Sequence, residues 1–162
     1  CLVGSEMCIR DSKELQLDTH SDSRGQIWPI YSSDNDFLPT FIEDKIAISH
    51  KGVLRGLHGD SEIGKLITCL AGSFQLVAVD LRKNSKTFGK YVGIIISDKS
   101  DFSFYIPGGF AHGFMCLSEK CTVNYKCSNY RDAKSEKTLN WNLWRTTTYK
   151  RGAWWNIDST YS

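Results

Sequence analysis

The stretch at residues 52–66, GVLRGLHGDSEIGKL, contains three side chains whose types could carry out chemistry together. Arg55, His58 and Lys65 stand within eleven positions, in a chain that has four histidines in all. A guanidinium binds phosphate oxygens as a fork, an imidazole titrates close to neutral pH, and an ammonium stabilises a negative charge beside it. The stretch therefore offers an anion-binding group, a proton-transfer group and a fixed positive charge.

Two more side chains of this kind occur later, Tyr125 in NYKCSNY and His112 in GGFAHGF. Because side chains alternate between the two faces of a strand, Tyr125 falls on the apolar side with Val123, and Lys65 falls on the side of Ile67. A phenol or an ammonium on an inward face needs a polar partner. Both side chains are therefore candidates for an interior site.

Strands are predicted for the segments that position these side chains. Apolar and β-branched residues predict strands over 65–71, 72–81, 91–98, 102–107, 111–118 and 121–130, with a tight turn at Ala71–Gly72. Short strands at this spacing, separated by Gly, Asp, Asn and Ser, favour a sandwich or a barrel. No long helical stripe occurs before residue 130, and one helical turn is predicted within 132–139.

A single domain is predicted from the length of 162 residues, of which 41% are hydrophobic. The first twelve residues, CLVGSEMCIRDS, show no period and are interpreted as a non-native extension. Residues 13–162 then form one domain without repeats or linkers. The Trp-rich segment WNLWRTTTYKRGAWW at its end has no clear assignment.

The charge balance argues against several classes of partner. The formal net charge is +2 and the pI is about 8.2, without a long block of one sign. This favours neither a nucleic acid nor a membrane surface as partner, whereas a local basic pocket for one phosphorylated ligand is compatible with it. The longest apolar run, YVGIIIS, is too short to span a bilayer, and no secretion signal opens the chain.

The cysteines indicate a reducing compartment. Six cysteines stand at positions 1, 8, 69, 116, 121 and 127. They form no C-x-x-C pair and match no familiar zinc ligand set. We expect free, buried thiols in a cytoplasmic protein and no bound metal.

Several motifs occur in one order along the chain: DSRG, GVLRGLH, GKL, VAVDLRKNSKTFGKYVG, IPGGFAHGF and YKCSNY. Through them, the chain from about residue 22 to residue 141 resembles the nucleotide-sugar 3,5-epimerase family of the dTDP-4-dehydrorhamnose type. The resemblance implies an all-β, cupin-type double-stranded β-helix, or jelly roll. It also implies a homodimer that uses no cofactor and acts on nucleoside-diphosphate 4-keto-6-deoxy sugars.

The resemblance implies a role for three residues in catalysis. Epimerisation next to a ketone needs a base for the α-proton, a positive group for the enolate and an acid on the opposite face of the sugar. His58 matches the family's base and Tyr125 matches its acid. Lys65 would lie beside the 4-keto oxygen and stabilise the negative charge.

Six further residues match substrate-binding positions of the family. Arg24 and Arg55 would meet the diphosphate. Glu43 and Lys45 would line the nucleotide, although the dTDP enzymes typically carry Gln and Asn there. His112 and Glu136 match ligand-contacting positions. Asp80, by contrast, is interpreted as a carboxylate that anchors a loop.

The chain also departs from the family pattern. Gly59 and Asp60 follow His58 where an aromatic residue is usual, which leaves a GDP-linked keto-heptose as an alternative substrate. The family orients its base with an aspartate beyond a final Trp-Pro segment, and the chain ends at WWNIDSTYS. This predicts either a domain truncated at its C-terminus or another carboxylate in that role.

Three other functions remain as alternatives. A catalytically inactive nucleotide-sugar-binding paralogue would share the same fold. A 3,4-ketoisomerase would need a second histidine close to the base, which Gly59 and Asp60 do not supply. A metal-dependent cupin would need a cluster of histidines with a carboxylate, whereas His58 and His112 are 54 residues apart.

Overall fold

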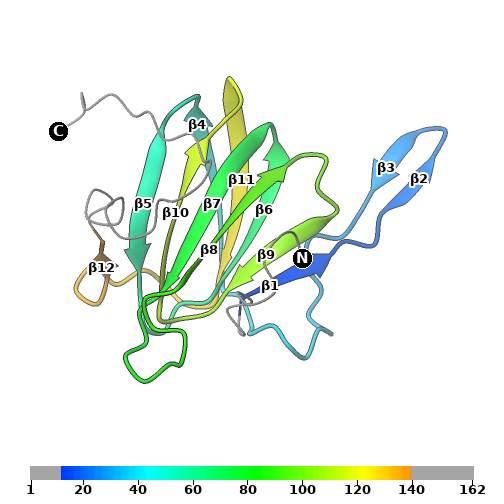
Figure 1. The fold of residues 1–162 in the computed structure, drawn as a ribbon. Helices are drawn as coiled ribbons and strands as arrows, with labels where there is room; N and C mark the ends of the chain where they lie inside the picture. Colours follow the sequence, from blue (N-terminus) through cyan, green and yellow to red (C-terminus); the bar gives the residue numbers. More distant parts are fainter. Residues whose placement is uncertain (1–11, 140–162) are drawn as a thin grey trace.

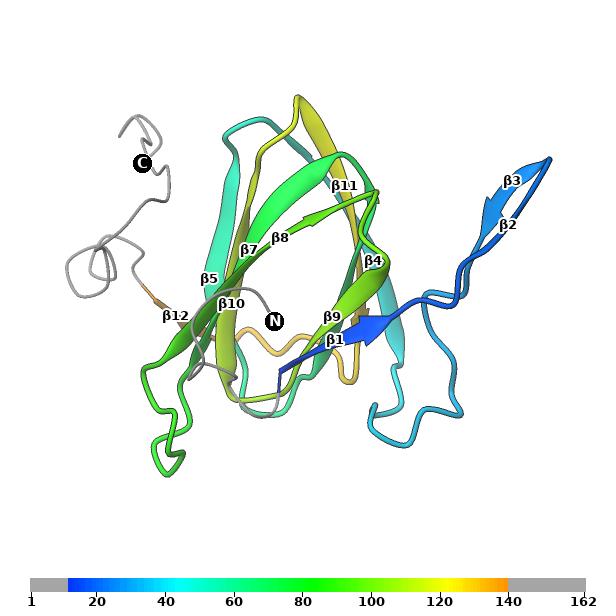
Figure 2. The same ribbon diagram turned by 45° about the vertical axis from the view of Figure 1, so that its right-hand side comes forward.

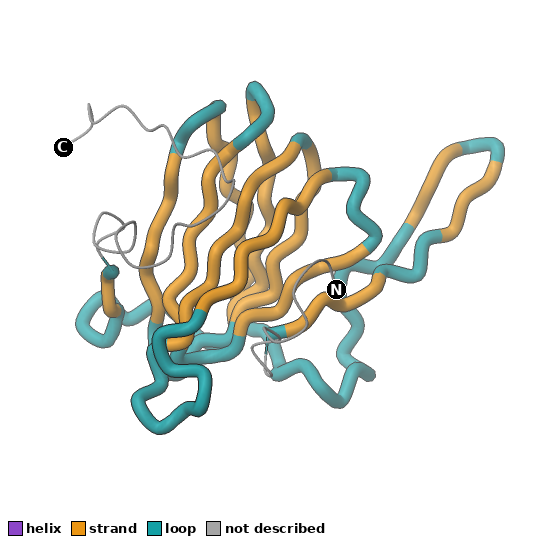
Figure 3. The backbone as a smooth tube through the Cα atoms, in the orientation of Figure 1, coloured by secondary structure: helices purple, strands orange, loops and turns teal. Residues whose placement is uncertain are grey.

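The computed structural model describes residues 12–139, and this part of the chain consists of strands and loops (Figure 3). The predictions for residues 1–11 and for the Trp-rich segment lie outside the described residues. No helix between residues 12 and 139 is long and apolar enough to cross a membrane. The strands are β1 (Lys13–Gln16), β2 (His20–Asp22), β3 (Gly25–Ile27), β4 (Glu43–His50), β5 (Leu54–Gly59), β6 (Lys65–Ala71), β7 (Ser73–Asp80), β8 (Tyr91–Ser97), β9 (Phe102–Ile106), β10 (Phe110–Cys116), β11 (Lys120–Cys127) and β12 (Lys137–Thr138).

Two five-stranded antiparallel sheets make up the body of the molecule (Figures 1 and 2). One sheet has the order β1-β9-β6-β11-β4, and the other has the order β12-β5-β10-β7-β8. Consecutive strands repeatedly change sheet, as when β9 pairs with β6 and β10 then pairs with β7. This crossing arrangement is the predicted jelly roll.

The hydrophobic core lies between the two sheets. Phe104 and Val123 come from one sheet and Phe74 and Phe114 from the other, and each is no more than 3% exposed. The rings of Phe74 and Phe114 are 5.2 Å apart between centroids. Both sheets turn an apolar face inward, and burial of these two faces against each other holds the sheets together.

The strands predicted over residues 65–130 are confirmed. A tight turn joins β6 to β7 at Gly72, whose φ of 76° suits a residue without a Cβ. The segment 132–139 contains the predicted helical turn in its first half and a short strand in its second half. A bond from the Glu136 amide to the Asp132 carbonyl closes one turn, and the chain then enters β12.

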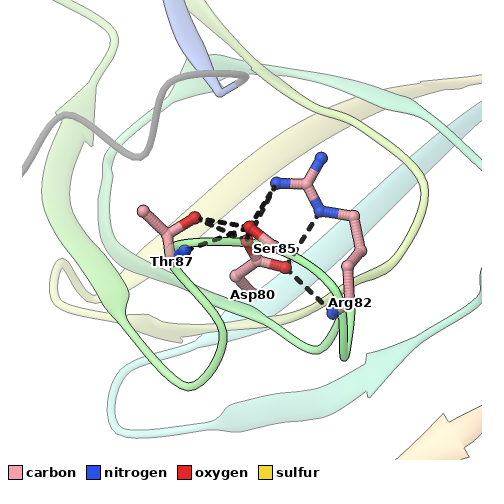
Figure 4. Close-up of polar contacts among 4 residues, drawn as sticks. All are labelled: Asp80, Arg82, Ser85 and Thr87. Carbon is pink, nitrogen blue, oxygen red and sulfur yellow. Dashed lines mark hydrogen bonds and ion pairs between the residues drawn. The ribbon is translucent and has the colours of Figure 1, made fainter.

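Asp80 anchors the loop that follows β7 (Figure 4). Its fully buried carboxylate accepts hydrogen bonds from the Arg82 guanidinium and from the hydroxyls of Ser85 and Thr87. Burial by itself would raise the pKa of Asp80, but these hydrogen bonds hold the pKa far below its ordinary value. The interpretation of Asp80 as a loop anchor is confirmed.

A hairpin of β2 and β3 stands away from the two sheets (Figures 1 and 2). It carries Arg24 at its turn, where the guanidinium pairs with Asp22 at 2.6 Å. The side chain of Arg24 is 88% exposed. The hairpin therefore holds one of the predicted site residues away from the body of the molecule.

Candidate active site

A cavity of about 210 Å³ is lined by side chains from both sheets. Eight of the nine predicted site residues line it: Glu43, Lys45, Arg55, His58, Lys65, His112, Tyr125 and Glu136. Arg24 is the exception, because the β2–β3 hairpin carries it elsewhere. The fold thus gathers residues from β4, β5, β6, β10 and β11 around one space.

His58 and His112 face each other across neighbouring strands. They are direct partners in the pairing of β5 with β10, and their ring centroids are 5.1 Å apart. The strands can approach closely because Gly59 lies against Phe110, where a Cβ would clash with the Phe110 carbonyl oxygen. A second histidine therefore does lie close to His58. The histidine that a ketoisomerase needs beside the base is thus supplied by β10 and not by the sequence neighbours Gly59 and Asp60.

Lys65 reaches the same pair of histidines from the opposite sheet. Its Nζ lies 3.2 Å from Nε2 of His112. An ammonium can only donate, so with Lys65 charged the His112 Nε2 accepts and its Nδ1 carries the proton. Burial lowers the pKa of Lys65, and burial together with the Lys65 charge lowers the pKa of His112 well below 6.5. His112 is therefore a neutral partner that holds the ammonium in place.

His58 lines the cavity, and a carboxylate contacts its ring. Its Nδ1 lies 3.1 Å from Oε1 of Glu136. Burial and the Lys65 charge lower the pKa of His58, and the Glu136 carboxylate opposes this shift. A neutral His58 donates its Nδ1 proton to Glu136, which leaves the lone pair of Nε2 as a proton acceptor.

Tyr125 reaches the cavity from β11, in the sheet opposite His58. Its ring packs against Phe114 with centroids 6.2 Å apart, so the phenol lies on the inward face as the alternation predicted. Burial raises the pKa of Tyr125. The phenol therefore stays protonated at neutral pH and can act as a proton donor.

Three charged residues complete the predicted set, Glu43 and Lys45 on β4 and Arg55 on β5. Lys45 Nζ lies 2.6 Å from Oε2 of Glu43, so these two form an ion pair in the cavity wall. Arg55 donates from Nε to the Ser49 hydroxyl at 2.8 Å and from a terminal nitrogen to the Ile48 carbonyl oxygen at 3.1 Å. These contacts fix the guanidinium while it lines the cavity.

Sequence reasoning missed several residues that line the cavity. They are Ala47, Gly59, Asp60, Ile63, Cys127, Asn129, Arg131 and Asp132. Asn129, Arg131 and Asp132 follow directly after the strand of Tyr125, so polar residues just past the end of that strand were the available signal. Among residues 12–139, no group of three or more His, Cys, Asp or Glu side chains is arranged to hold a metal ion.

Comparison with known proteins gives consistent matches. The family model described as dTDP-4-dehydrorhamnose 3,5-epimerase matches residues 6–148. The enzyme of that name from Salmonella typhimurium (strain LT2) is 46% identical over 149 residues, which are 87% of this chain and 81% of the relative. The Escherichia coli (strain K12) enzyme is 42% identical over 142 residues, which are 83% of this chain and 77% of the relative.

Solved structures resemble this fold closely. An epimerase from Legionella pneumophila, in complex with dTDP-4-keto-L-rhamnose, has a TM-score of 0.79 at 37% identity. The match covers 83% of the present chain and 76% of the Legionella pneumophila chain. A dTDP-4-dehydrorhamnose 3,5-epimerase from Bacillus anthracis, with TDP and pyrophosphate bound, has a TM-score of 0.80 at 32% identity. This match covers 85% of the present chain and 83% of the Bacillus anthracis chain. With the jelly roll and the residues around its cavity, these matches show that the chain belongs to the dTDP-4-dehydrorhamnose 3,5-epimerase family.

Proposed function

We propose that this chain epimerises a nucleoside-diphosphate 4-keto-6-deoxy sugar at C3, at C5 or at both carbons. One observation carries the proposal. His58 on β5 and Tyr125 on β11 come from opposite sheets and line the same cavity, together with Lys65. An acid and a base on two sides of one space are what inversion of a carbon centre requires.

In the proposed reaction, Nε2 of neutral His58 removes the proton from the carbon next to the ketone. The electrons of the broken C–H bond move to the ketone oxygen, where the Lys65 ammonium stabilises the enolate. The Tyr125 hydroxyl then gives a proton to the same carbon from the opposite face. The phenolate regains a proton from solvent, and His58 releases the one it took. Nothing is oxidised or reduced in these steps.

For the nucleotide, we propose contacts with Glu43, Lys45 and Arg55, the last facing the diphosphate. The relatives described above carry the dTDP name, which supports a thymidine nucleotide over the alternative of a GDP-linked keto-heptose. Glu43 and Lys45 form an ion pair at the wall where the substrate would lie. The nucleobase of a bound nucleotide would therefore meet both a negatively and a positively charged side chain.

The test is hydrogen exchange at the sugar. The protein is incubated in D₂O with a dTDP-linked 4-keto-6-deoxy sugar, and NMR follows deuterium at C3 and C5. We expect the wild-type protein to incorporate deuterium and His58→Asn to lower the rate about 10²- to 10⁴-fold, with dTDP affinity retained. His50→Asn is the matched control, because His50 is exposed at the end of β4 and does not line the cavity. Binding of dTDP without exchange, in this chain and in a version extended to the family's C-terminal aspartate, would instead support an inactive nucleotide-sugar-binding paralogue.

We also propose that the protein is a homodimer. β4 is the last strand of its sheet, and its outward-facing Ile46 and Ile48 are 64% and 51% exposed. An exposed apolar edge strand supports pairing with another chain. The molar mass in solution, measured by light scattering, is expected to be twice the 18.4 kDa of one chain.

In a homodimer, Arg24 of one chain could bind the diphosphate of a substrate held in the cavity of the other chain. With the hairpin in this position, Arg24 can meet a diphosphate only in the cavity of a second copy. Co-expression of Arg24→Ala chains with His58→Asn chains then yields one intact cavity in each mixed dimer. Random mixing restores about a quarter of the wild-type activity. No restoration would exclude a contribution of Arg24 to the partner's cavity.

We propose a cytoplasmic location as well. Cys69, Cys116, Cys121 and Cys127 are free and buried in the described part of the chain. Free thiols of this kind are typical of a reducing compartment.

A further inference from the structure

We propose that Glu136 is a positioning residue for His58: its carboxylate holds Nδ1 of the imidazole and thereby turns Nε2 toward the cavity. The resemblance to the family implied only that Glu136 contacts the substrate. This inference rests on the proposed function, in which His58 is the base, and it assigns Glu136 a different role from substrate binding.

Both oxygens of the Glu136 carboxylate are engaged by the protein. Oε1 lies 3.1 Å from Nδ1 of His58, and Oε2 accepts a hydrogen bond from Nε of Arg131. The side chain of Glu136 is 15% exposed. A carboxylate held at both oxygens has a fixed orientation, so it can fix the plane of the imidazole that it contacts.

The backbone around Glu136 is tied to the strand of His58. In the pairing of β12 with β5, Thr138 lies opposite His58, and Lys137 lies opposite Gly59. The Leu139 amide also donates to the Leu57 carbonyl at 2.9 Å. Because Glu136 directly precedes β12, this register brings its carboxylate to the imidazole.

Asp60, which follows His58 by two residues and also lines the cavity, has a different task. Its oxygens accept hydrogen bonds from the Ser135 hydroxyl and from the Glu62 amide. Asp60 therefore fastens the segment before Glu136 to the end of β5. Of the two carboxylates, Glu136 is the one in contact with the ring of His58.

Burial, which lowers the pKa of His58, and the charges of three neighbouring side chains determine how easily His58 takes up a proton. Lys65 on β6 and Arg131 lower its pKa through their positive charge, the neutral ring of His112 on β10 packs beside it, and Glu136 raises its pKa. Removal of the Glu136 charge must therefore lower the pKa of His58. The imidazole ring also loses the contact that fixes its orientation.

The first test is an NMR titration of the His58 ring in the free protein, which requires no substrate. We expect Glu136→Gln to lower the pKa of His58 relative to the wild type. Glu62→Gln is the matched control, because Glu62 is exposed and does not line the cavity, and it should leave the titration unchanged. An unchanged His58 pKa in Glu136→Gln would overturn the proposal.

The second test is the pH dependence of kcat/KM for epimerisation. A base must be neutral to act, so the rate falls as pH falls through the pKa of His58. In Glu136→Gln, the fall of kcat/KM on the acidic side of the pH profile, the acidic limb, should move to lower pH. We also expect kcat to fall about 10- to 100-fold. The affinity for dTDP should stay within about twofold of the wild type. Glu136→Asp keeps the charge and should retain a limb closer to that of the wild type.

A substrate contact at Glu136 would give a different result, namely a higher KM and a lower affinity for the substrate with kcat unchanged. That outcome would overturn the positioning role. A wild-type protein without exchange in D₂O would refute the proposed function, while the NMR titration would still decide whether Glu136 holds His58. The two failures can therefore be told apart.

Discussion

The side chains in the cavity are set for proton transfer by burial and by their neighbours. Burial lowers the pKa values of His58, Lys65 and His112 and raises that of Tyr125, so each pKa shift favours the uncharged form. A neutral imidazole and a protonated phenol at neutral pH are an available base and an available acid. Single substitutions can therefore separate the removal of the proton by His58 from the donation of a proton by Tyr125.

Tyr125→Phe removes the acid and leaves the base. The variant should still exchange the α-hydrogen in D₂O, because His58 can return a deuteron to the same face from which it took the proton. The amount of inverted product should fall about 100-fold or more, since no donor remains on the other face. NMR of one reaction measures both quantities.

Tyr130→Phe provides the matched control for this experiment. Tyr130 is 65% exposed and is not among the residues that line the cavity. It should behave as the wild type. If Tyr125→Phe lost exchange and inversion to the same degree, Tyr125 would not be an acid acting after His58.

At the scale of elements, the contact between β5 and β10 decides the position of the base. Gly59 and Gly113 let the two backbones meet, since a Cβ on Gly113 would stand 2.6 Å from the Arg55 carbonyl oxygen. Larger residues would force the strands apart, because the atoms they would meet belong to the backbone. The same contact also holds His58 beside His112.

Gly59→Ala should therefore damage both stability and activity. The added methyl group would clash with the Phe110 carbonyl oxygen and push β5 away from β10. We expect a loss of about 1–3 kcal/mol in the free energy of unfolding and a fall in the exchange rate in D₂O. Urea denaturation and the exchange assay measure the two effects.

Gly93→Ala on β8 is the control for this change. A Cβ at Gly93 would have its nearest neighbour, the Leu76 carbonyl oxygen, at 3.9 Å, which is an ordinary contact. Its stability should change by less than about 0.5 kcal/mol. Equal effects of the two substitutions would show that the close approach at Gly59 is unimportant.

At the scale of the whole molecule, the fold buries an imidazole that it keeps neutral. His112 is 4% exposed and its pKa is lowered well below 6.5, first by burial, then by the charge of Lys65 and then by that of His58 when His58 is protonated. The unfolded chain binds a proton on this residue below pH 6.5, whereas the folded protein does not. The stability contribution is therefore fully present above pH 6.5 and is lost as the pH falls.

The free energy of unfolding should decrease between pH 7 and pH 5 by up to about 1.4 kcal/mol per pH unit from His112 alone. Lowered pKa values at Asp80 and Glu136 act at more acidic pH, so this window reports the histidines. Urea denaturation at several pH values measures the slope. His112→Gln should reduce the slope and leave the contribution of His58, whose pKa is also lowered. A slope that this substitution does not change would contradict the assignment.

The strands from residue 65 to 130 could be predicted from the sequence, because enrichment in apolar and β-branched residues is a local property that each strand carries within itself. Eight of the nine predicted site residues also line one cavity, since motifs shared with a family preserve the positions of side chains. Arg24 was expected with them, but the β2–β3 hairpin carries it away from the cavity of its own chain.

The sequence by itself determined which side chains could serve as base, acid and cation, and on which face of a strand Tyr125 and Lys65 lie. Only the tertiary structure decided that His112 pairs with His58 and that the Glu136 carboxylate contacts Nδ1 of the same ring. The physical reason is that the face of a strand follows from its own alternation. The neighbour across a sheet depends on the register between segments far apart in the chain, which no local pattern specifies.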